Sequence, residues 1–600
     1  MDKSDVVRHL KLANDLWAIE GANPYSVRAH DFAADAIAKS ELSIDEILRL
    51  APGSIRGVGR ETLEMIRALQ TGGLPALLLR LQISIPVSCA ELLRLPGIGP
   101  KTAHTLVHEY DIYNTEDLQQ ALLQSRLGQV PGLGPKRMAR LRRDIHVFLE
   151  RQHSFPVAFA WPIAVQLEEM LRQVPQVLRV SVTGPLRRLV VMVPRIELVV
   201  AAVAPHKVAE FAKQASTGKD IQEVNTRTLD FSLSVSGSTV PVRLFVVPPE
   251  EFATALMETT GDETHQSVMK GLLLQRGINW TDEGRLELAQ PTAAVRSTVE
   301  AGEVSEEVKV SDAVKVSEAD HVSYVIKVSD EADIYHLIGL PYFPPEVREG
   351  QGILCKPERL VRQQDIRGDL HVHSNWSDGS LSIAEIGQVA DELGYEYVAI
   401  TDHSQSLTIA GGLTADQLRQ RKVEIDAVQR QTKAHLLNGI EVDILADGSL
   451  DLPDDVLFQL DIVIASVHSS MQQTKEQVTE RIVRAILHPA VHIIGHLTGR
   501  ILGRRSGYEL DVRELLDAAA KHRVLFELNA NPNRLDIAEE TLFEAKRRGL
   551  MVPINTDTHH REEFGNIRYG VRMALRGGLY KEDVLNTLPY DQLIDYLKRP

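Results

Sequence analysis

The sequence has few cysteines, no long apolar run and no excess of positive charge. Its two cysteines, Cys89 and Cys355, are too few for a disulfide framework or a zinc–thiolate site. No apolar stretch approaches the roughly 20 residues that a membrane helix needs, and the first residues lack the apolar segment of a signal peptide. The net charge of −16 argues against a uniformly basic coat for nucleic acid, although local patches remain compatible with it. We therefore expect a cytoplasmic protein.

At 600 residues the chain is too long for a single core, since domains typically hold roughly 100–200 residues. Its 44% hydrophobic and 25% charged residues are ordinary for a globular protein and exclude wholesale disorder. One stretch differs, because Glu300 to Asp333 contains ten acids and only three lysines. Three similar phrases repeat there: Val308–Asp312, Val314–Glu318 and Ile326–Asp330. We interpret residues 290–335 as a linker or an inserted edge element, and the alternating valines are equally compatible with a short hairpin.

A pair of glycines one residue apart occurs three times in the first 150 residues, each time between apolar helical stretches. The pairs are Gly57 and Gly59, Gly97 and Gly99, and Gly132 and Gly134, and the last two copies continue to Lys101 and Lys136. The pattern resembles the helix-hairpin-helix motif, in which backbone N–H groups after a tight turn face a phosphate. A helix-capping glycine would explain one copy, but three copies favour sequence-nonspecific DNA binding. Seven bases against two acids between Arg126 and Arg151 agree with this interpretation.

Residues 155–285 alternate between strand-like and helical patterns and contain a second set of motifs. Gly184–Arg188 reads Gly-Pro-Leu-Arg-Arg, Arg195–Glu197 reads Arg-Ile-Glu, and Val242–Phe245 reads Val-Arg-Leu-Phe. In this order, after the helical turns, they resemble the palm of a bacterial family X DNA polymerase. That family has Gly-Ser-x-Arg-Arg, Asp-x-Asp and Val-Asp-Leu-Arg at these places. Where the family has an aromatic pair before Thr-Gly, this chain has Glu258-Thr259.

The departures from the family pattern fall on the metal-binding aspartates. Nucleotidyl transfer needs carboxylates that hold two Mg²⁺ ions about 3.5–4 Å apart. Arg195 and Arg243 stand at two of the three aspartate positions, and arginine cannot lose its positive charge. Glu197 alone cannot assemble the site, so we predict a degenerate palm, retained as a structural or DNA-binding module. A register error of one or two residues is the competing explanation, but the nearby Asp230 is isolated.

From Asp365 to the end, short apolar strands alternate with amphipathic helical stretches. This order predicts parallel strands in a closed or nearly closed barrel, with the chemistry at the carboxyl ends of the strands. The strands are Leu370–His373, Tyr397–Thr401, Ile440–Val442, Ile462–Ser466, His492–Gly495, Val524–Leu528 and Val552–Asn555. Metal-ligand residue types fall at or just beyond these ends: His371, His373, Asp378, His403, Glu441, His468, His496, Asp557 and His559. Imidazoles with carboxylates suit Zn²⁺ or Mn²⁺, with Fe or Mg²⁺ as alternatives, and three ions fit nine ligands better than one.

These residues resemble the PHP (polymerase and histidinol phosphatase) domain at the C-terminus of bacterial family X polymerases. The matching phrases include His371–Ser374, Ile400–Ser404 and Asn555–His559. The resemblance implies three ions and a phosphate-ester hydrolase, with Mn²⁺ the metal most often expected. One ion would be held by His371, His373 and Asp557, one by His468 and His496 with Glu441 bridging these two, and the third by Asp378, His403 and His559.

The candidate catalytic residues are Glu441, Asp402 and Arg500. Glu441 is the central candidate catalytic residue. We predict that Asp402 orients a neighbouring histidine, and that Arg500 acts in catalysis as a phosphate clamp. Arg504 and Arg534 are further candidate clamps, with surface salt bridges an equally weighted alternative for all three arginines.

The metal centre and the DNA-binding turns together predict a DNA-repair phosphodiesterase. The family resemblance implies a 3′→5′ exonuclease, with activity at abasic sites or blocked 3′ ends. We expect a monomer that acts on gapped, nicked or 3′-ended DNA. The alternatives are a working gap-filling polymerase with proofreading, a phosphatase of the histidinol-phosphate type, and a non-enzymatic DNA-binding scaffold.

The expected fold is multidomain, α+β and α/β, with helix-hairpin-helix domains, a polymerase-like palm and thumb, and a distorted (β/α)7 PHP barrel. The predicted segments are a helical domain with one helix-hairpin-helix motif (1–80), a fingers-like helical domain with two such motifs (81–150), a degenerate palm and thumb (151–288), an acidic insert and linker (289–360), and the PHP domain (361–600).

Overall fold

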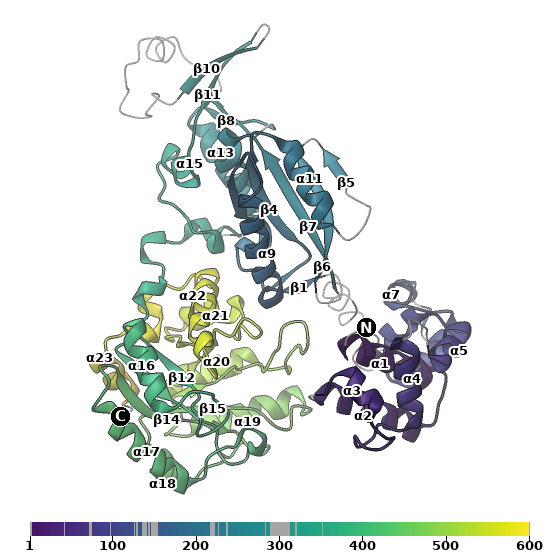
Figure 1. The fold of residues 1–600 in the computed structure, drawn as a ribbon. Helices are drawn as coiled ribbons and strands as arrows, with labels where there is room; N and C mark the ends of the chain where they lie inside the picture. Colours follow the sequence, from purple (N-terminus) through teal and green to yellow (C-terminus); the bar gives the residue numbers. More distant parts are fainter. Residues whose placement is uncertain are drawn as a thin grey trace. The chain divides into compact units, whose positions relative to one another are not determined.

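The computed structural model divides the chain into two compact units, Met1–Ser154 and Phe155–Pro600. Figure 1 shows the elements of each unit with their labels. The residues described are 3–40, 42–70, 75–95, 98–124, 126–127, 130–131, 133–134, 138, 141, 145, 154–216, 222–225, 227–235, 238–282, 284–288, 313–318, 321–350 and 352–598. The predicted helical, palm–thumb and barrel folds are confirmed.

The first unit is helical over its described residues. Its elements are α1 (Lys3–Ile19), α2 (Pro24–Lys39), α3 (Ile44–Arg49), α4 (Arg60–Gln70), α5 (Ala76–Ser84), the 3₁₀ helix η1 (Val87–Arg94), α6 (Pro100–Tyr110) and α7 (Thr115–Leu123). Apolar side chains such as Leu16, Ile66 and Leu92 share one core. Among the described residues no single helix is long and apolar enough to cross a membrane. The bent pair of α5 and η1 reaches the length and apolar composition of a membrane span only when the two helices are taken together.

The second unit begins with the palm, a five-stranded sheet of order β2-β4-β7-β6-β5 in which β4 and β7 are parallel. The strands are β2 (Val177–Val182), β4 (Ile196–Ala202), β5 (Gln222–Asn225), β6 (Thr228–Val235) and β7 (Ser238–Val247), with a small pair of β1 (Phe155–Pro156) and β3 (Met192–Val193). The helices are α9 (Val157–Arg172), α10 (Gly184–Arg187) and α11 (Pro205–Ala215). Side chains of β4 alternate: Leu198 and Val200 join the main core, whereas Val199 and Ala201 face α12 (Phe252–Thr260). The sheet is therefore covered on both faces.

The thumb follows, with η2 (Pro249–Glu251), α12, α13 (Glu263–Gln275), β8 (Ile278–Trp280), β9 (Leu286–Leu288), β10 (Ala313–Glu318), β11 (His321–Ile326) and α15 (Glu331–Leu337). Strands β10 and β11 form an antiparallel hairpin that extends β9 and β8 into a four-stranded sheet. Part of the acidic stretch is thus the hairpin that the alternating valines allowed. Residues 289–312 lie outside the described residues.

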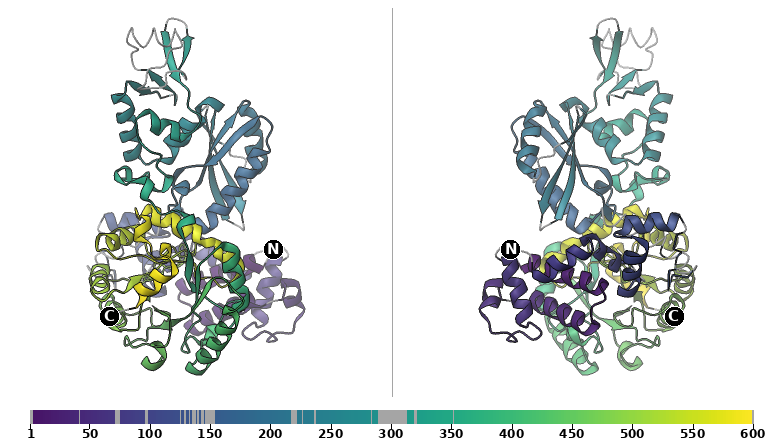
Figure 2. Two further views of the ribbon diagram at one scale, coloured as in Figure 1. Left: turned by 90° about the vertical axis from the view of Figure 1, so that its left-hand side faces the viewer. Right: turned by 90° about the vertical axis from the view of Figure 1, so that its right-hand side faces the viewer.

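Parallel strands form the C-terminal barrel (Figure 2). Six of them pair in chain order, β12 (Gly368–Val372), β13 (Tyr397–Ile400), β14 (His435–Asp443), β15 (Ile462–Ser466), β16 (Ile493–Ile494) and β17 (Leu525–Phe526). Glu527 interrupts the sixth predicted strand, so that β18 (Leu528–Asn529) pairs instead with β19 (Ile554–Asn555). A bridge between Val372 and Thr558 closes the ring. This interruption is what distorts the barrel.

Helices and 3₁₀ helices connect these strands. They are η4 (Pro345–Val347), η5 (Gly352–Leu354), η6 (Pro357–Arg359), η7 (Gln363–Asp365), α16 (Ile383–Leu393), η8 (Thr408–Ala410), α17 (Ala415–Gln429), α18 (Asp454–Leu457), α19 (Lys475–Leu487), α20 (Val512–His522), α21 (Glu539–Arg547), η9 (Arg561–Asn566), α22 (Ile567–Arg576), η10 (Lys581–Asp583), η11 (Leu585–Thr587) and α23 (Tyr590–Leu597). Capping boxes start three of the long ones, with Ser382 and Glu385, Thr414 and Gln417, and Thr474 and Gln477. Each box satisfies backbone N–H groups at the start of its helix.

Candidate metal centre

The barrel brings all nine predicted ligands together at the carboxyl ends of its strands. Glu441 lies in the middle, with its side chain fully buried. Its Oε1 atom is 3.0 Å from His496 Nε2 and 3.3 Å from His468 Nε2. Its Oε2 atom faces three more imidazoles, at 2.8 Å (His403 Nδ1) and 3.6 Å (His371 Nε2 and His373 Nε2). A single carboxylate therefore touches five of the six predicted histidine ligands.

Two aspartates connect the remaining ligand to this group. Asp557 Oδ1 is 3.2 Å from His373 Nε2 and 3.9 Å from His559 Nδ1. Asp378 lies 3.4 Å from His559 Nε2 and 3.6 Å from His403 Nε2. The loops after β12, β13 and β19 supply these residues, so segments nearly 190 positions apart in the chain meet at one point.

The unsatisfied atoms of this cluster fit a divalent-metal site. Buried side-chain atoms normally have hydrogen-bond partners. Within the part of the chain that the structure describes, several buried ligand atoms have none: His371 Nε2, His373 Nδ1 and Nε2, His403 Nδ1, Glu441 Oε2 and His496 Nδ1. Imidazole nitrogens and carboxylate oxygens that face one another unpaired are the donor set that Zn²⁺ and Mn²⁺ take.

Three groups have donor atoms close enough together to hold an ion each. They are His371, His373 and Asp557; His373, Asp378, His403 and His559; and His403, Glu441 and His468. The first two contain the sets that the family resemblance implies. In the third, His403 accompanies His468, whereas the resemblance implies His496. How nine ligands divide among three ions therefore stays a prediction.

Two buried carboxylates that the sequence analysis missed hold the ligands in place. Glu527 accepts hydrogen bonds from His371 Nδ1 at 2.7 Å and from the backbone N–H of His496 at 2.9 Å. Asp443 accepts one from His468 Nδ1. Each bond turns the other ring nitrogen, Nε2, toward the metal centre and sets the tautomer. The available signals were an acid inside the apolar strand 524–528 and an acid two residues after Glu441, on the same strand face.

Replacement of Glu527 by glutamine is expected to weaken metal binding about 10–100-fold. The oxygen of the glutamine amide can accept a hydrogen bond from either His371 Nδ1 or the His496 N–H group. Its NH₂ group then faces the other of these two donors and cannot accept from it. The measurement is bound Mn²⁺ per chain during a titration of the metal-free protein. Asp391→Asn is the matched control, because this carboxylate also accepts backbone N–H groups (Lys433 and Ala434), but before strand β14 begins. Equal metal affinity in the two variants would contradict the assignment.

Protonation of the metal-free centre is uneven. Burial, together with the neighbouring charge of His403, lowers the pKa of His373 to about 4. Burial also lowers the pKa of His403, but the charges of Glu441 and Asp378 outweigh it and raise the pKa to about 10. By the same balance, Glu441 and Asp443 raise the pKa of His468 to about 9. Asp378 and Asp557 do so for His559, also to about 9.

Metal binding is therefore expected to release protons and to strengthen with pH. His403, His468 and His559 carry protons at pH 7 in the metal-free protein, and an ion must displace each from the nitrogen it takes. Below pH 9, the apparent affinity should rise up to about tenfold per pH unit for each proton displaced. Calorimetric titration with Mn²⁺ in two buffers of different ionisation enthalpy counts these protons. Heats that do not depend on the buffer would contradict the expectation.

The prediction that Asp402 orients a neighbouring histidine is wrong, because its carboxylate has other partners. Its carboxylate accepts from Ser374 N at 2.8 Å, from Ser377 Oγ at 2.8 Å and from Arg421 Nη1 at 2.7 Å, and not from a histidine. The reason is the fully buried guanidinium of Arg421, which requires a counter-charge at the end of β13. Asp402 instead anchors the loop that carries Asp378.

The arginines near the barrel mouth also differ from expectation. Arg500, the predicted catalytic clamp, donates from Nε to the backbone oxygen of Arg534 at 2.9 Å and also to that of Leu535. Its guanidinium therefore supports the loop, and its role as a catalytic phosphate clamp stays a prediction. Arg504 is exposed. Arg534 is half-buried, and its Nε lies 3.8 Å from Asp557 Oδ2. Of these three arginines, Arg534 is therefore the one with its guanidinium beside a predicted metal ligand.

The helix-hairpin-helix residues lie in the first unit. Gly59, Gly99 and Gly134 play the same local part: each backbone oxygen accepts from the N–H group four residues later, at 3.1, 2.9 and 2.9 Å. A Cβ atom at any of the three would meet open space, so a ligand backbone can approach closely. Gly57 has a φ of +90°, and a Cβ there would clash with Phe32. Lys101 is exposed on α6, whereas Gly97, Gly132 and Lys136 lie outside the described residues.

The palm places arginines against the carboxylates at its predicted catalytic positions. Glu197 on β4 pairs in register with Arg243 on β7. Arg243 forms a two-pronged ion pair with Asp230, at 2.8 and 2.7 Å. Arg195 Nε lies 2.8 Å from Glu197 Oε1. Both carboxylates are thus paired with guanidinium groups.

Comparison with known proteins matches three segments and the whole chain. Residues 369–531 match the PHP domain, residues 255–349 the DNA polymerase beta thumb, and residues 90–146 the SAM-like helix-hairpin-helix tandem. The chain is 34% identical over 603 residues to a DNA polymerase/3′-5′ exonuclease PolX of Bacillus subtilis (strain 168), covering 100% of both proteins. Over 239 residues it is 29% identical to a probable phosphatase of Thermoanaerobacter sp. (strain X514), covering 38% of this chain and 94% of that protein.

Proposed function

Since the chain belongs to the family of the DNA polymerase/3′-5′ exonuclease PolX, we propose that it is a metal-dependent 3′→5′ exonuclease with a polymerase palm that is inactive or very weak. The observation that carries this proposal is a contrast between two sites in one chain. The barrel keeps all nine predicted ligands in one cluster, six of them buried, and several of the buried donor atoms are unpaired. In the palm, arginines pair with the carboxylates instead.

The barrel residues define what the centre can do. Three divalent ions, Mn²⁺ or Zn²⁺ with Mg²⁺ as an alternative, would be held by the nine ligands and would activate a water molecule and neutralise phosphate charge. Glu441 supplies the negative charge that keeps five imidazoles together. Glu527 and Asp443 hold the imidazoles of His371 and His468 with Nε2 facing inward. Arg534, beside Asp557, is placed to hold a phosphate oxygen of the substrate.

The palm residues argue against efficient nucleotide addition. An incoming ion would have to displace Arg195 from Glu197 and Arg243 from Asp230, and a guanidinium repels it. The turn Gly184–Arg188 resembles the family's triphosphate cradle and is called the cradle turn below. Its Arg188 already donates to Glu349 and to the backbone oxygen of Thr260. A triphosphate would therefore have to compete with an internal carboxylate.

The substrate class follows from the domains joined to the barrel. We propose that the helix-hairpin-helix turns and the palm and thumb bind gapped, nicked or 3′-ended DNA without sequence preference, in the cytoplasm and as a monomer. Activity on abasic sites and blocked 3′ ends would use the same centre. The second candidate is a small-molecule phosphatase, favoured by the probable phosphatases that match the barrel alone.

The test is a strand with a 5′ label, incubated with Mn²⁺. A ladder that shortens from the 3′ end supports the exonuclease. Full-length strand combined with release of phosphate from histidinol phosphate would instead favour the phosphatase. Intact strand with retained DNA binding and no phosphate release would favour the scaffold.

A further inference from the structure

Helix α22 follows the last metal ligands and is held tightly on the barrel. After Asp557 and His559, the chain turns through η9, where Glu563 Oε2 accepts from the His559 N–H group at 2.7 Å. A Cβ atom at Gly570 of α22 would lie 2.4 Å from Ile554 Cγ2, so the helix and strand β19 are in close contact. The inner face of α22 is therefore fixed to the strand that leads to the ligands.

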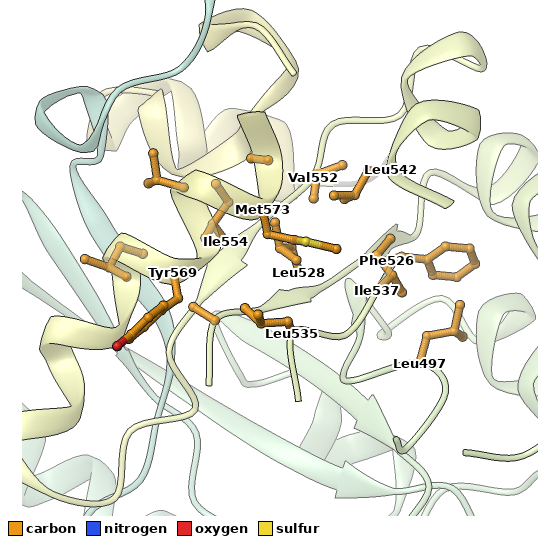
Figure 3. Packing of buried hydrophobic residues seen from close by; sticks show 14 of the residues in the cluster. Leu497, Phe526, Leu528, Leu535, Ile537, Leu542, Val552, Ile554, Tyr569 and Met573 are labelled. Atoms are coloured by element: carbon orange, nitrogen blue, oxygen red, sulfur yellow. The ribbon is translucent and has the colours of Figure 1, made fainter. Parts of the chain in front are cut away.

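Buried side chains reinforce this contact. Met573 points from α22 toward Leu528 on β18 (Figure 3), and Tyr569 of α22 and Ile554 of β19 are buried in the same core. All four belong to one core that continues into the palm, where it includes Val157 and other residues. Movement of α22 would therefore disturb both the barrel and the palm.

Arg572, on the same helix, reaches the palm and the thumb. Its Nη2 donates to the backbone oxygen of Arg187 at 2.6 Å, and its Nε donates to Glu346 Oε1 at 2.5 Å. Its guanidinium lies 4.3 Å from the centre of the Trp161 ring. One side chain thus contacts the cradle turn, η4 at the end of the thumb and the first palm helix.

Arg576, one helical turn later, makes a second contact of the same kind. Its Nη1 donates to the backbone oxygen of Arg188 at 3.0 Å. Its Nη2 donates to Glu349 at 2.8 Å and to Glu539 at 2.9 Å. Glu349 also accepts from Arg188, so the palm and barrel arginines share one carboxylate.

Each of these ion pairs has one nearly buried partner. The side chain of Arg576 is 7% exposed and that of Glu346 is 7% exposed. Buried ion pairs of this kind lose much of their energy when one partner is removed, because the other charge is left desolvated. Arg572 and Arg576 thus attach α22 to the cradle turn through the backbone carbonyl groups of Arg187 and Arg188.

The loop after His496 makes another contact with the palm. A Cβ atom at Gly503 would lie 2.8 Å from Pro156 Cγ, and φ at Gly503 is +72°. Leu502 and Phe155 pack against the same core. The palm therefore touches two of the barrel segments that follow predicted ligands, the one after His496 and the one after His559.

We propose that Arg572 and Arg576 form a joint that makes the palm a positioning domain for the nuclease, setting the bound strand end against the metal centre. The inference rests on the proposed exonuclease function. The two arginines are positioning residues, since they contact no metal ligand and act through α22 and the cradle turn. Without the joint, DNA would still bind to the palm, thumb and N-terminal domains, but its end would no longer be held at the centre.

The test compares two substrates in the full chain with Mn²⁺. In the double variant Arg572→Ala and Arg576→Ala, kcat and kcat/KM for 3′-end removal from gapped DNA should fall at least about tenfold, while the DNA still binds. Hydrolysis of bis(4-nitrophenyl) phosphate, which needs no positioned strand, should stay within about twofold of the native rate. Thermal unfolding should separate into two transitions as palm and barrel uncouple. Arg568→Ala is the matched control, since Arg568 is exposed on α22 and its recorded contact is with Tyr569.

Each result decides the matter. An unchanged kcat/KM for DNA would overturn the proposal, and so would an equal fall in both activities, because the joint would then act on the metal centre itself. If the double variant does not fold, Arg576→Lys tests the same split, since an ammonium group cannot bridge Arg188 and Glu349 as the guanidinium does. A native protein inactive on DNA would refute the proposed function, whereas the unfolding transitions would still test the joint.

Discussion

Glu441→Gln is expected to abolish strand shortening and to leave DNA binding intact. The glutamine keeps the shape of the side chain but removes the negative charge that five imidazoles face. At least one ion should be lost, and the exonuclease rate should fall at least about a thousandfold, or roughly 4 kcal/mol of transition-state stabilisation. The measurements are the shortening rate of a 5′-labelled strand, bound Mn²⁺ per chain, and the affinity for gapped DNA.

Glu396→Gln is the matched control for this variant. Glu396 precedes strand β13, where it pairs with Arg367 away from the ligand end of the barrel. The control should keep native activity and metal content. Glu441→Gln with native activity would show that the nine-residue cluster is not the catalytic centre. Loss of the ladder with retained DNA binding separates an enzyme from a DNA-binding scaffold.

Primer extension on a gapped template is expected to be absent or very weak, even with all four deoxynucleotides and Mn²⁺. Arg195 and Arg243 occupy the carboxylate positions and neutralise Glu197 and Asp230. Loss of the charges that stabilise a transition state commonly costs about a hundredfold to a thousandfold per group. The palm therefore lacks the stabilisation that two metal ions would supply.

The extension assay is sharpest in the Glu441→Gln background, because shortening there cannot mask weak synthesis. A primer of unchanged length with nucleotides present supports a degenerate palm. An extended primer would contradict it and would make the chain a polymerase as well as a nuclease, the two activities that the name of the Bacillus subtilis relative gives for that protein. The Arg195 and Arg243 positions would then have to be reassigned.

Sequence periodicity predicted the barrel and its ligand cluster because both depend on local patterns. Each ligand follows an apolar strand, and parallel strands bring their carboxyl ends to one edge. Asp402 and Arg500 also lie at this edge, yet their side chains serve Arg421 and two backbone carbonyls. The position of a residue at a strand end therefore predicted where its side chain lies, but not which group that side chain contacts.

The partner of a side chain depends on residues far away in the chain. Glu527 interrupts a strand and contacts His371, which lies 156 positions earlier. Arg572 and Arg576 contact the backbone of Arg187 and Arg188, which lie more than 380 positions earlier. Nothing in the local pattern of α22 distinguishes these arginines from the exposed Arg568.

The sequence by itself predicted the domain order, the candidate metal ligands and the arginines at the expected aspartate positions of the palm, since composition, spacing and residue chemistry are local properties. The tertiary structure decided which atoms those residues face. It paired Arg243 with Asp230, turned Asp402 away from the histidines, set Glu527 beneath His371, and attached the cradle turn to α22. Such contacts depend on packing between distant segments, where desolvation makes an unpaired charge costly and so selects one partner among many.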